Sequence, residues 1–243
     1  MRVMSLACSV CFVAGSVSAQ ELIVNGGFEA GNTGFASDYS YSSSTNCCEG
    51  QYTVRDRGNT FNGAFVNPPP SIPGSVQMMV VNGSTVPNLR IWRQTVAVTP
   101  GLTYSLSLQG CTAVAGGPAI LQFQMNGTLV GSSVTLPAVT RQWVTLAAVW
   151  TAPAGVTSVE VAVRDLNTAT FPNDFYMDNI SMTRRCPADF NDDGFLDGFD
   201  YDDFVACFEG DTCPPGKTAD FNRDGFADGF DYDEFVTAFE AGC

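Results

Sequence analysis

The sequence predicts a mainly β protein, with a two-sheet β-sandwich over residues 20–184 followed by a small α-helical module over residues 186–243. Three observations support this prediction. Short apolar or alternating runs, separated by turn sequences, fill the first part. A segment of 18 residues, 188–205, returns 31 residues later in the last part. Sixteen acidic residues against two basic ones give that last part the whole formal net charge of −14.

The first 19 residues read as a secretory signal peptide. Arg2 provides a positive start, residues 6–14 form an apolar run, and the small residues 17–19 resemble a cleavage site. The apolar run is much shorter than the ~20 residues that span a bilayer. We therefore expect a secreted, extracellular protein that begins near Gln20. It would be anchored at a cell surface only through a protein partner, without direct membrane insertion.

Six runs in the sandwich region predict strands: 75–81, 90–98, 103–108, 120–126, 143–150 and 158–163. Turn sequences such as Asn82-Gly83, Pro100-Gly101 and Asn126-Gly127 separate them. Short strands at this spacing are typical of a two-sheet sandwich. Trp143 and Trp150 lie in otherwise apolar runs, so we expect them in the core.

Each copy of the repeat contains a twelve-residue loop with oxygen-bearing side chains at positions 1, 3, 5, 9 and 12 and glycine at position 6. Calcium takes roughly six to eight oxygen ligands, and such a loop supplies them from alternate side chains and one backbone carbonyl at position 7. The sequence therefore predicts two calcium ions as cofactors. The expected side-chain ligands are Asp189, Asn191, Asp193, Asp197 and Asp200, and then Asp220, Asn222, Asp224, Asp228 and Asp231. Phe195 and Phe226 would add their carbonyls, and Gly194 and Gly225 would allow the sharp turns.

Apolar residues follow each loop at the spacing of one helical face. They are Phe204, Cys207 and Phe208 after the first loop, and Phe235, Ala238 and Phe239 after the second. No comparable pattern precedes either loop, so each copy predicts a loop followed by one helix.

This doubled pattern resembles type I dockerin modules, and the final Gly242-Cys243 resembles the dockerin variety that ends in Gly-Cys. The resemblance covers roughly the last quarter of the chain. It implies calcium-dependent folding and docking to a cohesin-like scaffold or cell-surface protein. Dockerins recognise partners through loop positions 10 and 11, here Gly198-Phe199 and Gly229-Phe230, where the cellulosomal type has small hydroxyl residues. The alternative is that the loops are purely structural calcium clips.

Four cysteines lie in the tail, where disulfides would stabilise a module with a small core. We expect Cys186 to pair with Cys243 and Cys207 with Cys213, although connectivity does not follow from sequence. Cys47, Cys48 and Cys111 lie in the body, and one of these three must stay free or pair elsewhere.

The body resembles the galactose-binding-like jelly rolls used as carbohydrate-binding modules. The resemblance rests on residues 22–29, 94–104, 143–144 and 176–181, in the expected order. It implies a structural calcium near Glu29 and Asp178, for which a solvated carboxylate pair is an equal alternative. Sugar binding needs exposed aromatic faces. The candidates are Trp92, Tyr39, Tyr41 and Tyr52, with a core position as the alternative for Trp92.

The chain has no histidine, which excludes Ser-His-Asp and Cys-His catalysis and histidine-ligated zinc. A neutral body with an acidic tail argues against nucleic acid as a partner. The sequence therefore predicts a secreted non-catalytic binding protein, with a carbohydrate or surface polymer as the ligand of the body. One alternative is a structural cell-envelope protein with a calcium-stabilised tail. The other is a small glycoside hydrolase that uses paired carboxylates.

Overall fold

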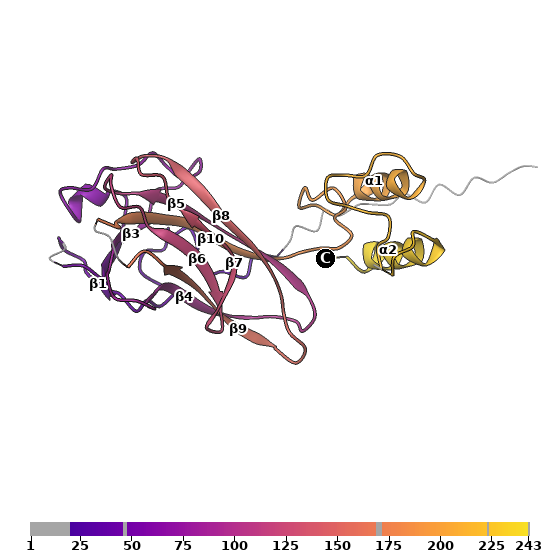
Figure 1. Ribbon diagram of the computed structural model, residues 1–243, viewed down its shortest axis with the longest axis horizontal. Coiled ribbons are helices and arrows are strands. Elements are labelled where there is room, and N and C mark those ends of the chain that lie inside the picture. Colours follow the sequence, from indigo (N-terminus) through magenta and orange to yellow (C-terminus); the bar gives the residue numbers. More distant parts are fainter. Residues whose placement is uncertain (1–19, 46–47, 169–171, 223, 243) are drawn as a thin grey trace, which may run out of the picture. The chain divides into compact units, whose positions relative to one another are not determined.

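The computed structural model describes residues 20–45, 48–168, 172–222 and 224–242 (Figure 1). The chain forms two compact units, a β unit of Gln20–Arg184 and a smaller unit, the tail, that begins at Arg185. The predicted signal peptide lies outside the described residues. Among the residues described, no helix is both long enough and apolar enough to cross a membrane.

The β unit is a sandwich of two sheets, which confirms the predicted fold class. The six-stranded sheet has the order β1-β2-β3-β10-β5-β8, and the four-stranded sheet has the order β4-β9-β6-β7. The first consists of β1 Ser40–Tyr41, β2 Gln51–Arg55, β3 Met78–Asn82, β10 Phe175–Arg184, β5 Thr103–Thr112 and β8 Trp143–Thr151. The second consists of β4 Arg90–Ala97, β9 Ser158–Asp165, β6 Ile120–Met125 and β7 Thr128–Thr135. A short 3-10 helix, η1 Gly58–Thr60, follows β2.

Alternation along the strands places one face of each sheet in the core. In β5, Tyr104, Leu106 and Leu108 are buried, and the serines between them are half-buried. Inward side chains of both sheets form one hydrophobic core. The β6–β7 hairpin turns at Asn126-Gly127, where φ is 46° and 87°. Asn-Gly suits such a turn because both residues tolerate positive φ.

The tail contains two helices, α1 Gly198–Phe208 and α2 Gly229–Ala241, each directly after a predicted loop. Asp197 and Asp228 are their N-caps. Each forms a capping box with the aspartate three positions later, Asp200 or Asp231. The last residues of each loop therefore also start its helix.

Aromatic rings from the two copies form the core of the tail. Phe204 stacks on its repeat equivalent Phe235, with ring centroids 3.9 Å apart. Phe190 meets Phe204 edge-on at 5.2 Å, and the equivalent pair, Phe221 and Phe235, meets at 5.4 Å. The duplicated sequence therefore forms two equivalent halves around a shared aromatic core.

Candidate functional site

Backbone N–H groups of the first loop, residues 189–200, donate to the predicted ligand side chains. Asp189 accepts from Asp193 at 3.1 Å and from Gly194 at 3.0 Å, Asn191 from Asp193 at 2.9 Å, Asp193 from Phe195 at 2.9 Å, and Asp197 from Phe199 at 2.8 Å. Gly194 has φ of 86°, which favours glycine. The oxygens at positions 1, 3, 5 and 9 thus organise the turn of the loop.

The second loop, residues 220–231, repeats this pattern except for the hydrogen bond from the N–H at position 5 to the carboxylate at position 1. Asp220 accepts from Gly225 at 3.0 Å, Asn222 from Asp224 at 2.8 Å, Asp224 from Phe226 at 2.9 Å, and Asp228 from Phe230 at 2.9 Å. Gly225 has φ of 98°. Both loops therefore hold the predicted ligands in matching local geometry.

The carboxylates at position 12 are fully buried and close each loop onto its helix. Asp200 accepts from the N–H groups of Phe190 at 2.7 Å, Asn191 at 3.2 Å and Asp197 at 2.9 Å. Asp231 accepts in the same way from Asn222 at 2.9 Å and from Asp228 at 2.8 Å. These backbone hydrogen bonds hold the pKa of Asp231 below its ordinary value.

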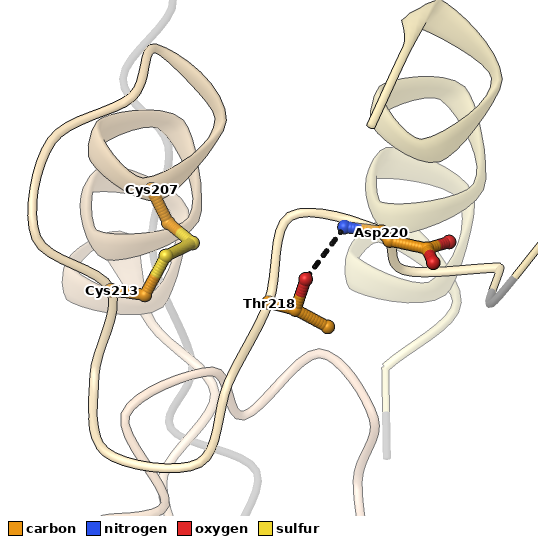
Figure 2. Close-up of a disulfide and its surroundings, with 4 residues drawn as sticks. All are labelled: Cys207, Cys213, Thr218 and Asp220. Atoms are coloured by element: carbon orange, nitrogen blue, oxygen red, sulfur yellow. Dashed lines mark hydrogen bonds between the residues drawn. A yellow bond between two sulfur atoms is a disulfide. The ribbon is translucent and has the colours of Figure 1, made fainter. Parts of the chain in front are cut away.

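One oxygen of the second loop lacks a partner. Asp220 Oδ1 is buried without a hydrogen bond, while the Asp220 N–H donates to Thr218 Oγ1 at 3.3 Å (Figure 2). A buried, unpaired carboxylate oxygen is costly, and a cation in the loop would satisfy it. In the first loop, burial and the charges of Asp200, Asp192 and Asp193 raise the pKa of Asp189, although a hydrogen bond from Gly194 opposes them. Both observations fit a cation site.

Within the described part of the chain, no three acidic or cysteine side chains converge into a cluster that could hold a metal ion. Several of the carboxylate oxygens instead face the backbone N–H groups named above. The two calcium ions therefore stay a prediction, and the residues that would hold them are the predicted ligands at positions 1, 3, 5, 7, 9 and 12 of each loop.

Four phenylalanines of the tail are exposed. Phe199 and Phe230, at the predicted partner positions, are 70% and 73% exposed, and the glycines before them are exposed as well. Phe195 and Phe226, at loop position 7, are 49% and 72% exposed. Sequence reasoning assigned only the carbonyls of these two residues a role. Their side chains add two more exposed apolar groups to the tail, one in each half.

The disulfide Cys207–Cys213 is present, with the two Cα atoms 4.5 Å apart (Figure 2). Cys186 is disulfide-bonded, and its predicted partner Cys243 lies outside the described residues. In the body, Cys111 is a buried thiol, and burial raises its pKa to about 11.

Glu29 and Asp178 both hold the segment before β3. Glu29 accepts from the N–H groups of Val76 at 2.7 Å and Gln77 at 3.1 Å. Asp178 is buried and accepts from Ser75 Oγ at 2.6 Å and from Ser71 Oγ. Burial raises the pKa of Asp178, and the nearby charge of Glu29 adds to the shift. The two carboxylates thus act on one segment, and a calcium ion between them stays a prediction.

Two of the four predicted sugar platforms, Tyr39 and Tyr52, are wrong, because both are buried in the sandwich core. Trp92 is fully buried in the same core, which is the alternative given for it from the sequence. Tyr41 is 46% exposed and meets the Tyr52 ring edge-on at 5.5 Å. Trp143 and Trp150, expected in the core, are half-buried at its margins.

Sequence reasoning missed an open cleft of about 380 Å³ beside β4 and β9. It is lined by Gly34, Phe35, Ala36, Arg93, Gln94, Thr95 and Glu160. Glu160 accepts from Arg93 at 3.2 Å and from Arg90 at 2.9 Å, and Arg90 also donates to Asp38 at 2.8 Å. Arg90 thereby holds the pKa of Asp38 below its ordinary value. The cleft therefore carries hydrogen-bonding groups fixed by paired charges. The three residues of β4 at the cleft, Arg93, Gln94 and Thr95, follow one another without a buried residue between them, so the alternation of the strand gave no signal for the cleft.

Two buried carboxylates bear on the hydrolase alternative. Burial raises the pKa of Asp165 and of Asp174 to about 6. Asp165 accepts from the N–H groups of Ile120 at 2.8 Å and Asn167 at 2.9 Å, and Asp174 accepts from Gly83 N–H at 2.9 Å. Raised pKa values also occur in structural networks. These hydrogen bonds tie neighbouring segments together and account for both carboxylates as structural groups.

No family model and no curated protein matches the chain. Among solved structures, it is similar to the N-terminal CBM22-1-CBM22-2 tandem domain from Paenibacillus barcinonensis Xyn10C, with 14% identity over 70% of this chain and 47% of that chain and a TM-score of 0.46. It is also similar to Family 16 Carbohydrate Binding Module-2, with 22% identity over 67% of this chain and 99% of that chain and a TM-score of 0.39. A third similar structure is the sugar-binding EclA C-terminal domain, with 20% identity over 46% of this chain and 88% of that chain and a TM-score of 0.37. The chain spans about half of the tandem and most of the other two.

Proposed function

We propose that this is an exported, non-catalytic binding protein. Its tail binds two calcium ions and docks onto a cohesin-like scaffold or cell-surface protein, and its sandwich binds a carbohydrate or surface polymer. The observation that best supports the tail's role is that most of the loop hydrogen bonds recur at equivalent positions of the two loops. The buried Asp220 Oδ1, which has no partner, is where the second loop departs from the first. Two loops of one geometry, rich in carboxylates, suit two hard cations.

Docking is supported by the exposed phenylalanines. Phe199 and Phe230 occupy equivalent places at the start of α1 and α2, and their rings are largely in water. Exposed apolar side chains gathered in one small unit mark interaction surfaces, and aromatic residues often contribute most of the binding energy at an interface. Because residues 186–243 carry a net charge of −14, the receptor of the tail should present basic residues around apolar pockets.

Calcium titration of the full-length, metal-stripped protein tests the tail. We expect two sites by calorimetry, with a gain of helix by circular dichroism. Asp189→Ala with Asp220→Ala should abolish both sites. The matched control, Asp202→Ala with Asp211→Ala, removes the same charge from exposed positions outside the loops and should leave both sites intact. An absence of binding by the wild-type protein at millimolar calcium would contradict the proposal.

For the sandwich, the cleft at Arg93 and Glu160 favours carbohydrate binding, since sugar hydroxyls pair with fixed guanidinium and carboxylate groups. A glycan array should show saturable binding that Arg93→Ala weakens. The control Arg57→Ala changes a guanidinium whose side chain is 67% exposed and should have no effect. Melting temperatures of both variants check their folding. The structural envelope alternative expects no saturable binding to any glycan.

A further inference from the structure

Lys217, in the connection between the two halves of the tail, reaches back to the first loop. Its Nζ donates to the backbone carbonyl of Asp189 at 3.0 Å and to the Asp192 carboxylate at 2.9 Å. It also lies 5.7 Å from the ring centroid of Phe190. Its side chain is only 17% exposed, so the ammonium group is held against the first loop and differs from an exposed surface lysine.

The connection that carries Lys217 is held at several points. The disulfide Cys207–Cys213 ties it to α1, and Lys217 N–H donates to the Pro214 carbonyl at 3.0 Å. Figure 2 shows the chain running from this disulfide past Thr218 to Asp220. Asp220 is the first position of the second loop, three residues after Lys217. The contacts of Lys217 with the first loop thus lie three residues before the start of the second.

We propose that Lys217 is a positioning residue that couples the two loops, so that calcium in one loop raises the affinity of the other. This inference rests on the proposed calcium binding. Lys217 binds the carbonyl oxygen of Asp189, which is not one of its predicted ligand atoms, and Asp192, at position 4, is not a predicted ligand. The contact therefore orders the loop and leaves the ligand oxygens available.

Asp192 gives the first loop a feature that the second cannot repeat. Its φ of 59° lies in the left-handed region, which residues other than glycine adopt infrequently, although aspartate adopts it more often than most. Ion pairs with Lys217 at 2.9 Å and with Arg185 at 3.1 Å stabilise it there. The equivalent residue of the second loop is Arg223, which has no carboxylate that could pair with a lysine. The coupling contact thus runs from the connection to the first loop.

The sign of the effect separates positioning from simple electrostatics. A nearby cation repels calcium, so electrostatics alone predicts tighter calcium binding when Lys217 alone is removed, and little change when the charges of Lys217 and Asp192 are removed together. Positioning predicts weaker and uncoupled binding. The charge-neutral variant Lys217→Met with Asp192→Asn removes the ion pair without changing the net charge, and Lys217→Arg keeps a charged donor as the matched control.

Calorimetric calcium titration of the full chain tests the coupling. Asp193→Ala and Asp224→Ala, each disabling one loop, give the affinity of one site with and without the other. Without the Lys217 change, each loop should bind calcium roughly fivefold or more tightly when the other loop is intact than when the other loop is disabled. In the charge-neutral variant this ratio should fall close to one, and Lys217→Arg should preserve it. Circular dichroism at saturating calcium checks that each variant reaches the folded state.

Two outcomes would overturn the inference. A coupling ratio that survives in the charge-neutral variant would remove the role of Lys217, while two-site binding by the wild-type protein would leave the proposed function standing. Absence of calcium binding by the wild-type protein would remove the proposed function of the tail and the coupling together.

Discussion

Replacing Phe204 with alanine tests whether the shared aromatic core holds the tail together. Phe204 is fully buried, stacks on Phe235 at 3.9 Å and meets Phe190 at 5.2 Å. Truncating a buried phenylalanine costs about 3–5 kcal/mol. The hydrophobic core of so small a unit contributes about as much to stability. We therefore expect Phe204→Ala to unfold the tail in calcium-free buffer.

Calcium should reverse this loss. A ligand at 100 times its Kd stabilises the binding-competent form by about 2.7 kcal/mol, so two sites would contribute about 5 kcal/mol. The helical circular dichroism signal should therefore return at saturating calcium. Urea unfolding without and with calcium measures the cost of the substitution and the stabilisation by calcium. The control is Phe199→Ala, whose side chain is 70% exposed in the same helix and should change stability by less than about 0.5 kcal/mol. A cost below about 1 kcal/mol for Phe204→Ala, or an equal cost for Phe199→Ala, would refute the reasoning.

Three further predictions concern other parts of the structure. Asp200→Ala should destabilise the calcium-free tail by at least about 2 kcal/mol, because three backbone N–H groups lose a charged acceptor. Urea unfolding measures this loss. The control Asp202→Ala, at an exposed position, should not destabilise the tail. Removing the disulfide by Cys207→Ser with Cys213→Ser should cost about 2 kcal/mol, because the bond closes a short loop; an unchanged melting temperature would show that the connection needs no tether. Burial raises the pKa of Asp165 and of Asp174 from 3.8 to about 6, so the folded sandwich binds protons that the unfolded chain has released. Its unfolding free energy should therefore fall as pH rises from about 4 to above 6, by up to about 3 kcal/mol for each group. Tryptophan fluorescence reports this unfolding selectively, since all three tryptophans lie in the sandwich, and a rise of stability over that range would contradict it.

The geometry of the tail could be predicted from sequence because its contacts are local. The hydrogen bonds that shape each loop join residues at most ten positions apart, so the spacing of aspartate, asparagine and glycine already specifies them. The helices also begin where the loops end, since the aspartates at positions 9 and 12 form the capping boxes. The exposed rings of Phe195 and Phe226 could not be predicted in this way. Loop position 7 supplies only its backbone carbonyl, which every residue has, so the loop pattern does not specify the side chain there.

The six predicted runs correspond to β3, β4, β5, β6, β8 and β9 and leave out β1, β2, β7 and β10. The pattern of the sequence misses β7, which pairs with β6 at the edge of its sheet, and whose side chains are mostly exposed on both faces. Without one buried face, the alternation of apolar and polar residues that identifies a strand is lost. It also misses β2, between β1 and β3, and β10, in the middle of the six-stranded sheet, so an edge position does not explain every missed strand.

The sugar platforms failed for a related reason: residue type does not determine which face of a strand a side chain occupies. A register shift between Arg90 and Trp92 breaks the alternation of β4, and Ile91 and Trp92 are both buried. The next residue, Arg93, then lies at the cleft, where it pairs with Glu160 from a strand 67 residues away. Neither the bulge nor this pairing has a local signature. A ligand site on the sandwich is therefore best sought with variants of Arg93 and Glu160, whose proximity only the folded structure reveals, whereas the tail can be tested at the positions that its repeat already identifies.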